Sequence, residues 1–169
     1  YQNSLSGSKH FRFGFSFVNE NLDSKLINEL LEDGRASFRT LSERVGVSVA
    51  TISRHLSGLE ERGVITGYAP TIKYEKLGYG LTAIIQLKVE GAQIPDITTK
   101  LSKYEQMISI YEVTGDYDLI VIAKFEDTAG MNKQIKAILI DPIIKASNTS
   151  VVLNAVEENR QFSLSETAV

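Results

Sequence analysis

The chain contains no cysteine, so its 169 residues can form neither disulfide bonds nor thiolate metal sites. This favours a cytoplasmic protein. No apolar run approaches the roughly 20 residues of a membrane span, and the N-terminus lacks the continuous apolar core of a signal peptide. Basic charge is also scarce, because 18 Lys and Arg face 21 Asp and Glu for a net charge of −3. The composition is that of a soluble globular protein and argues against charge-driven, non-specific nucleic-acid binding.

The spacing in residues 37–66 predicts two short helices joined by a tight turn. Ser37 is placed to cap a first helix, whose apolar positions recur at helical intervals: Phe38, Leu41 and Val45. Gly46 follows where a left-handed residue ends a helix, and Ser48 can cap the next one. Two such helices make a helix-turn-helix, the element that lays a helix in the DNA major groove.

The second helix has two distinct faces. Its apolar stripe is Val49, Ile52, Leu56 and Leu59. The opposite face has no acid and carries Ala50, Thr51, Ser53, Arg54, His55 and Ser57. Small side chains let a backbone approach the bases, and Arg54 can fork onto guanine or phosphate. The candidate DNA-binding residues are Arg39, Ser48, Ala50, Thr51, Ser53, Arg54 and His55. The alternative is the solvated face of an ordinary helical hairpin.

A third helix is expected upstream of this pair. Its apolar stripe is Leu22, Leu26, Ile27, Leu30 and Leu31, between a cap at Asn21 and a stop at Gly34. The acids on its other side should face away from phosphates: Asp23, Glu29, Glu32 and Asp33. Residues 22–66 thus predict a tri-helical DNA-binding domain. It has six Lys and Arg against seven Asp and Glu, so its basic residues act only locally.

Residues 1–21 form an extension of unknown role. Phe11, Phe13, Phe15 and Phe17 alternate with polar or small residues and make up four of the chain's seven phenylalanines. A period of two suggests a strand with one apolar face, and the alternative is a flexible leader.

The second half predicts a different kind of domain. Residues 67–80 indicate a hinge strand or linker, and residues 81–157 alternate strands and helices. Strands are expected at 81–89, 107–113, 117–125 and 144–158, and helices at 94–104 and 127–140. The order βαββαβ gives a ferredoxin-like sandwich, followed by a tail at 158–169.

The strand at 117–125 is apolar on both faces, which implies association. Leu119, Val121 and Ala123 lie on one face, and Ile120 and Ile122 lie on the other. Helices on one side of a sheet cover only one of these faces. We therefore expect a homodimer through the second domain, whose two recognition helices could read half-sites about 34 Å apart.

Three motifs carry a resemblance to a known family. They are the opening LDSKLINELLEDGR, the exit GVITGY after the helix-turn-helix, and the turn TGDYD. In this order and spacing the chain resembles the Lrp/AsnC, or feast/famine, transcriptional regulators over residues 22–157. The resemblance implies an α+β fold with an N-terminal winged or tri-helical helix-turn-helix domain and a C-terminal ferredoxin-like βαββαβ domain of the RAM type. It also implies double-stranded DNA as partner, dimers or octamers, and in many members an amino-acid effector between subunits.

Carried over by position, the resemblance gives the effector-binding residues Thr114, Gly115, Asp116, Tyr117, Asp118 and Thr149. Gly115 permits a tight turn whose N–H groups can hold a carboxylate, and Asp116 or Asp118 can accept from an α-ammonium group. The alternative is an ordinary polar hairpin turn. A metal site is not expected, because no third acid or histidine accompanies the two carboxylates.

Two other functions compete with a sequence-specific regulator. One is an architectural protein that wraps DNA with little base reading. The other is a tetrapyrrole decarboxylase, an enzyme branch of the same architecture that would want histidine or arginine in the second domain. Residues 81–157 contain neither, and no nucleophile set or phosphate loop is present, so we expect no enzyme activity and no cofactor.

Overall fold

The computed structural model describes residues 22–165, which form two units. One comprises residues 22–70 together with 159–165, and the other comprises residues 71–158. None of the helices in this described part of the chain is both long enough and apolar enough to cross a membrane.

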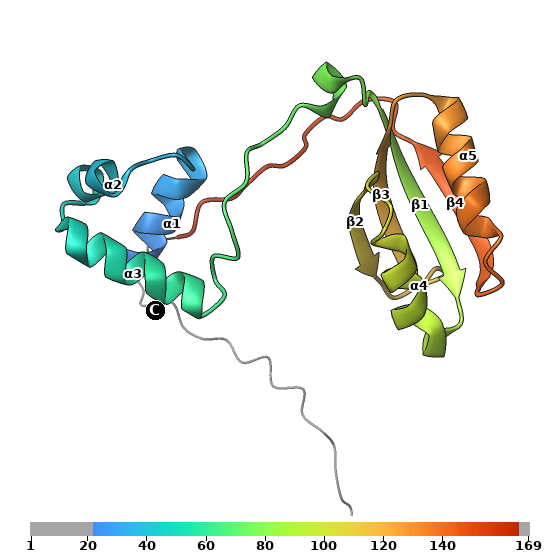
Figure 1. The fold of residues 1–169 in the computed structure, drawn as a ribbon, viewed down its shortest axis with the longest axis horizontal. Helices are drawn as coiled ribbons and strands as arrows, with labels where there is room; N and C mark the ends of the chain where they lie inside the picture. Colours follow the sequence, from blue (N-terminus) through green and yellow to red (C-terminus); the bar gives the residue numbers. More distant parts are fainter. Residues whose placement is uncertain (1–21, 166–169) are drawn as a thin grey trace, which may run out of the picture. The chain divides into compact units, whose positions relative to one another are not determined.

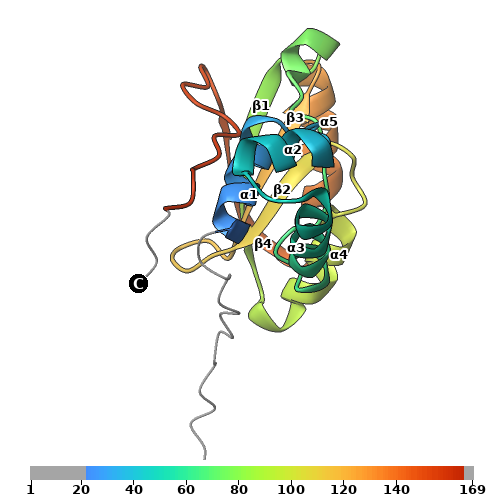
Figure 2. The same ribbon diagram turned by 90° about the vertical axis from the view of Figure 1, so that its left-hand side faces the viewer.

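The first unit is a bundle of three short helices (Figures 1 and 2). They are α1 (Leu22–Glu32), α2 (Phe38–Val45) and α3 (Val49–Glu61). Their shared core consists of Leu26, Leu41, Ile52, Leu56 and Leu59. Residues 22–70 contain no strand, so the described part of this unit is tri-helical without a wing.

The expected positions of Phe38, Val49 and Asp23 in this unit are wrong. Phe38 and Val49 are each 46% exposed, because each occupies the first position of its helix, beyond the core layer. Asp23 was expected on the outer face of α1, yet it is only 1% exposed. The predicted cap at Asn21 and the strand within 1–21 lie outside the described residues.

A C-terminal segment completes the helical unit. The Asn28 side-chain amide donates to the Leu164 carbonyl at 3.0 Å, and the Leu164 N–H donates to Asn28 Oδ1 at 2.7 Å. This two-way pairing satisfies the backbone of Leu164 as a neighbouring strand would. Residues 159–165 therefore belong to the same unit as α1.

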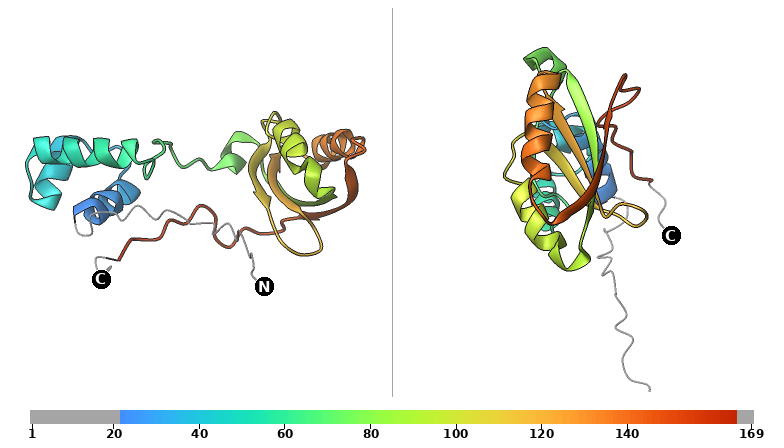
Figure 3. Two further views of the ribbon diagram at one scale, coloured as in Figure 1. Left: turned by 90° about the horizontal axis from the view of Figure 1, so that it is seen from below. Right: turned by 90° about the vertical axis from the view of Figure 1, so that its right-hand side faces the viewer.

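The second unit is a four-stranded antiparallel sheet with both helices on one face (Figure 3). The strands are β1 (Leu81–Val89), β2 (Met107–Glu112), β3 (Leu119–Phe125) and β4 (Ile144–Val151), in the order β2-β3-β1-β4. The helices are α4 (Ile94–Leu101) and α5 (Thr128–Leu139). Alternate residues of β1 and β3 pack against both helices, as the period of two predicted. The ferredoxin-like sandwich is confirmed.

Two extended segments differ from prediction. The last strand ends at Val151, not at 158, since β1 supplies partners only as far as Ala83. Residues 67–80 form no strand and instead contain a short 3₁₀-helix, η1 (Tyr74–Leu77), which ends at Gly78 with φ 94°. β-branched residues favour extended backbone, but a strand also requires a partner for its hydrogen bonds.

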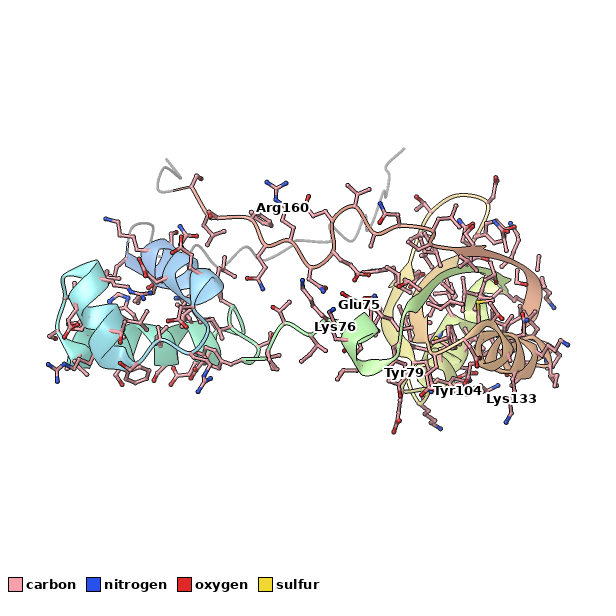
Figure 4. The ribbon with its side chains drawn as sticks, turned by 90° about the horizontal axis from the view of Figure 1, so that it is seen from above. Glu75, Lys76, Tyr79, Tyr104, Lys133 and Arg160 are labelled. Atoms are coloured by element: carbon pink, nitrogen blue, oxygen red, sulfur yellow. The ribbon has the colours of Figure 1, made fainter. Side chains whose placement is uncertain are left out.

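A buried cation lies on the sheet face that the helices leave open. The Lys124 ammonium donates to Thr82 Oγ1 at 3.0 Å and to both oxygens of Glu158 at 2.8 and 2.9 Å. The Lys124 ammonium also lies 5.8 Å from the centre of the Tyr74 ring. Tyr74 begins the short helix η1, in which Figure 4 labels Glu75 and Lys76. Lys124 thus joins the segments that enter and leave the sheet unit.

Candidate nucleic-acid interface and effector loop

The two helices of the helix-turn-helix begin with the same cap. Ser37 Oγ accepts from the Thr40 N–H at 3.0 Å, and Ser48 Oγ accepts from the Thr51 N–H at 3.2 Å. Between them Gly46 adopts the left-handed conformation, with φ 79°. These local signals were all predicted and are confirmed. In each cap the serine and threonine hydroxyls are also bonded to each other, so Ser48 and Thr51 help to fix the start of α3.

The outer face of α3 is small and polar. Ala50, Arg54 and Ser57 are exposed, and Ser53 is half-buried beside them. This follows from the helical repeat, since the buried positions Ile52, Leu56 and Leu59 occupy the opposite face. Among the residues that the structure describes, Arg54 has no side-chain hydrogen bond or ion pair. Its guanidinium is therefore available to a base or phosphate.

Arg39 is the one candidate that lies outside α3 and its cap. Its guanidinium projects from α2, is 86% exposed and forms an ion pair with Glu43 at 3.1 Å. Arg44 is less available, because it is paired with Glu29 of α1 at 3.1 Å. Exposed ion pairs of this kind contribute little to stability, so Arg39 can exchange Glu43 for a phosphate at small cost.

His55 is placed differently from the other candidates. Its Nδ1 lies 2.6 Å from Asp23 Oδ1, so one side of the imidazole faces α1. Asp23 Oδ2 accepts from the Arg62 guanidinium at 2.7 Å, and Arg62 Nε donates to the Gly58 carbonyl at 2.9 Å. These side chains, with Arg54, line a surface cavity of about 210 Å³.

Sequence reasoning missed Asp23 and Arg62. The signal for Asp23 was present, because Asp23, Leu26, Ile27 and Leu30 have the i, i+3, i+4, i+7 spacing of an inward helical stripe. An acid at an inward position calls for a cationic partner. The sequence alone does not say whether that partner comes from α2 or α3.

The turn between β2 and β3 is the predicted effector loop. Thr114, Gly115 and Asp116 are exposed, and Gly115 has φ 124°, as a tight turn requires. The Lys88 ammonium donates to the backbone carbonyl of Asp116 at 2.7 Å and not to its side-chain carboxylate. The loop is therefore anchored through its backbone.

Asp118 and Thr149 occupy more constrained positions. Asp118 Oδ2 accepts from the Val89 N–H at 2.8 Å, next to the last β1–β3 pair, Leu87 and Leu119. Tyr117, beside it, is half-buried. Thr149 pairs with Ile85 across the sheet, so β1 separates it from β3 and the loop. One chain does not bring Thr149 and the loop together.

Both units match known proteins. Residues 20–66 match a winged helix-turn-helix DNA-binding family, and residues 82–162 match the Lrp/AsnC ligand-binding domain. An HTH-type transcriptional regulator of Pyrococcus abyssi is 40% identical over 140 residues, which cover 83% of this chain and 95% of that protein. The chain belongs to the Lrp/AsnC family of transcriptional regulators. The HTH-type regulator FL11 of the same organism is 30% identical over 86% of this chain and 96% of its own length.

Solved structures of related regulators share the fold of this Lrp/AsnC protein. A feast or famine regulatory protein from M. tuberculosis, complexed with L-methionine, superposes with a TM-score of 0.78 at 26% identity. The match covers 85% of this chain and 97% of that one. A regulator from Neisseria meningitidis, also with L-methionine, has a TM-score of 0.76 at 26% identity, covering 85% and 94% of the two chains.

Proposed function

We propose that this Lrp/AsnC regulator reads specific DNA sequences through the outer face of α3. The observation that carries the proposal is the face itself, in which Arg54, without a side-chain partner in the described part of the chain, lies among Ala50, Ser53 and Ser57. Arg54 contacts a guanine edge or a phosphate, while the small neighbours permit close approach. Ser48, Thr51 and Arg39 contact the flanking backbone, and His55 lies at the side of the helix.

The DNA-binding form is a homodimer built on the open face of the sheet. Ile84, Ile120 and Ile122 point to this face and are only half-buried, and Tyr111 is 53% exposed. A second copy of the same sheet would cover these side chains through a two-fold axis. Larger assemblies, including octamers, can grow from such dimers.

The regulator binds an amino acid or a similar small molecule at residues 114–118, between subunits. Support comes from the two relatives solved with L-methionine and from the ligand-binding family matched by residues 82–162. The Asp116 carboxylate accepts from the ligand ammonium group, and the turn around Gly115 offers N–H groups to its carboxylate. Thr149 joins this site from a neighbouring subunit, because β1 separates it from the loop of its own chain. The relatives are named as regulators, in keeping with a binding protein without enzyme activity.

A gel-shift titration with DNA upstream of the protein's own gene tests the DNA assignment. Arg54→Ala should weaken operator binding by about tenfold, equivalent to about 1.4 kcal/mol, within the range for loss of a bidentate base contact. Arg35→Ala is the matched control, because it removes the same charge from the turn between α1 and α2. Equal affinities for wild type and Arg54→Ala on this DNA would refute the assignment.

Competitor DNA separates the regulator from an architectural protein that wraps DNA. A regulator should prefer its operator to scrambled duplex by at least about a thousandfold. A ratio near one with a long footprint would favour the wrapping function. Calorimetry with a panel of amino acids tests the effector site, where Asp116→Ala should abolish binding and Glu112→Ala, an exposed acid at the end of β2, should not.

A further inference from the structure

A single buried carboxylate joins α1 to the side of α3. Asp23 is 1% exposed, and each of its oxygens faces a different basic side chain, His55 at 2.6 Å and Arg62 at 2.7 Å. Arg62 is held again by its bond to the Gly58 carbonyl. A long basic side chain on a helix surface normally samples many rotamers, and here Arg62 is fixed by contacts at two of its nitrogens.

The fixed side chains line a cavity together with Arg54 from the outer face of α3. The cavity, of about 210 Å³, is lined by Asp23, Arg54, His55, Gly58 and Arg62. Two guanidinium groups and one carboxylate leave a net positive charge there even with a neutral imidazole. Gly58 has no side chain to fill the space, and a Cβ built on it would meet no atom within 4 Å. The cavity is thus open, polar and cationic.

We propose that this cavity binds a phosphate group of the DNA backbone and that Asp23 is the positioning residue that forms it. The inference rests on the proposed function, because the cavity shares Arg54 with the face that reads DNA. A phosphate has only acceptor oxygens, which suit a guanidinium fork and an imidazole N–H. Asp23 accepts from His55 Nδ1–H, so the imidazole can donate to the phosphate only from Nε2–H, which requires the doubly protonated ring in the DNA complex.

This assignment gives Asp23 a counter-intuitive effect on affinity. Removing an acid near DNA should tighten binding if only charge matters, because repulsion of the phosphates falls. Removing a positioning acid should weaken binding, because Arg62 and His55 lose their fixed places. Asp23→Asn has nearly the same shape, so it distinguishes the two. Asp33→Asn is the matched control, since Asp33 is also on the α1 side of the bundle, and within residues 22–165 its carboxylate contacts only the Arg35 N–H and the Arg44 guanidinium.

A second variant, His55→Asn, keeps the test decisive if Asp23→Asn fails to fold. In His55→Asn, the amide nitrogen can take the place of Nδ1 and keep the bond to Asp23, while nothing replaces Nε2. Thermal unfolding followed by circular dichroism should therefore match wild type. A structural role alone predicts unchanged DNA binding, and a phosphate contact predicts a loss.

The experiment measures dissociation constants of the full chain by fluorescence anisotropy, on operator and on scrambled duplex, across a series of salt concentrations. Asp23→Asn and His55→Asn should each weaken both duplexes about equally, by about three- to tenfold, and each should lower the salt slope by about one. Asp33→Asn should bind as tightly as wild type or slightly more tightly.

Each outcome bears on the inference. If His55→Asn binds like wild type, or Asp23→Asn binds more tightly as Asp33→Asn does, the phosphate site is refuted. Specific operator binding by wild type, lost in Arg54→Ala, would then leave the proposed function standing without it. If wild type binds neither duplex, or Arg54→Ala matches it on both, the proposed function fails and the inference fails with it.

Discussion

Replacing Glu158 with glutamine should destabilise the sheet unit more than removing Lys124, although the two side chains belong to one ion pair. The reason is unequal burial, because the Lys124 side chain is 7% exposed and that of Glu158 is 39% exposed. Glu158→Gln removes the negative charge beside a buried ammonium and leaves it only neutral partners among the described residues, namely one amide oxygen, Thr82 Oγ1 and the Tyr74 ring. Loss of a charged hydrogen-bond partner at such a site costs about 2 kcal/mol.

Lys124→Met has the opposite consequence. It leaves a carboxylate that water can solvate and fills the buried position with an apolar chain of similar length. Replacing a buried charge in this way is often neutral, so we expect a change within about 1 kcal/mol. The exposed pair Lys145–Glu90, whose side chains are 58% and 60% exposed at 3.9 Å, supplies a control. Glu90→Gln should change stability by less than about 0.5 kcal/mol.

Urea unfolding followed by tyrosine fluorescence measures these differences. Residues 71–158 contain five of the seven tyrosines and the chain has no tryptophan, so the signal reports mainly on this unit. A loss of 2 kcal/mol would lower its melting temperature by roughly 10 °C. If Lys124→Met costs as much as Glu158→Gln, or if Glu158→Gln matches Glu90→Gln, the argument from burial is wrong.

Three further predictions concern stability. Ser48→Ala removes the cap of α3 and should cost about 1 kcal/mol, measured by thermal unfolding of the helical unit. Leu56→Ala should cost about 3 kcal/mol and unfold that unit first, whereas Val49→Ala, at an exposed position, should stay within about 0.5 kcal/mol. Lys100 lowers the pKa of Asp141, so this contact stabilises the fold above pH 4 and is lost as the pH falls through the lowered value. Acid titration of Asp141→Asn should show a smaller loss of stability over that window, and an unchanged curve would contradict this.

Local signals in the sequence predicted the elements of this fold well. The caps at Ser37 and Ser48 and the turn at Gly46 depend on neighbours within four residues, so a short window contains all the information needed. Three of the four predicted inward positions of α3 (Ile52, Leu56 and Leu59) and the alternation of β1 follow from the repeats of helix and strand.

Apart from Phe38 and Val49, which lie at the first position of their helices, the errors arose where a residue depends on a distant partner. The inward position of Asp23 requires His55 and Arg62, which lie 32 and 39 residues away. The fold of residues 67–80 depends on which strand is available for pairing, which no local pattern specifies. Arg54 was recognisable as a candidate because its role requires only an exposed position, whereas the orientation of His55 required the packing of α1 against α3.

The helical unit is discontinuous in the chain: residues 71–158, the sheet unit, are inserted between residues 22–70 and residues 159–165. The backbone therefore crosses between the two units twice. A protease that cuts once, within residues 67–80, would leave the three helices without a covalent link to the sheet unit, because the second crossing joins the sheet only to residues 159–165. In the described residues of such a nicked molecule, the pair of hydrogen bonds between Asn28 and Leu164 would still join the DNA-reading helices to the segment that follows the sheet. Cleavage would thus convert a covalent attachment into an equilibrium one, while the nicked fragments could stay associated under native conditions.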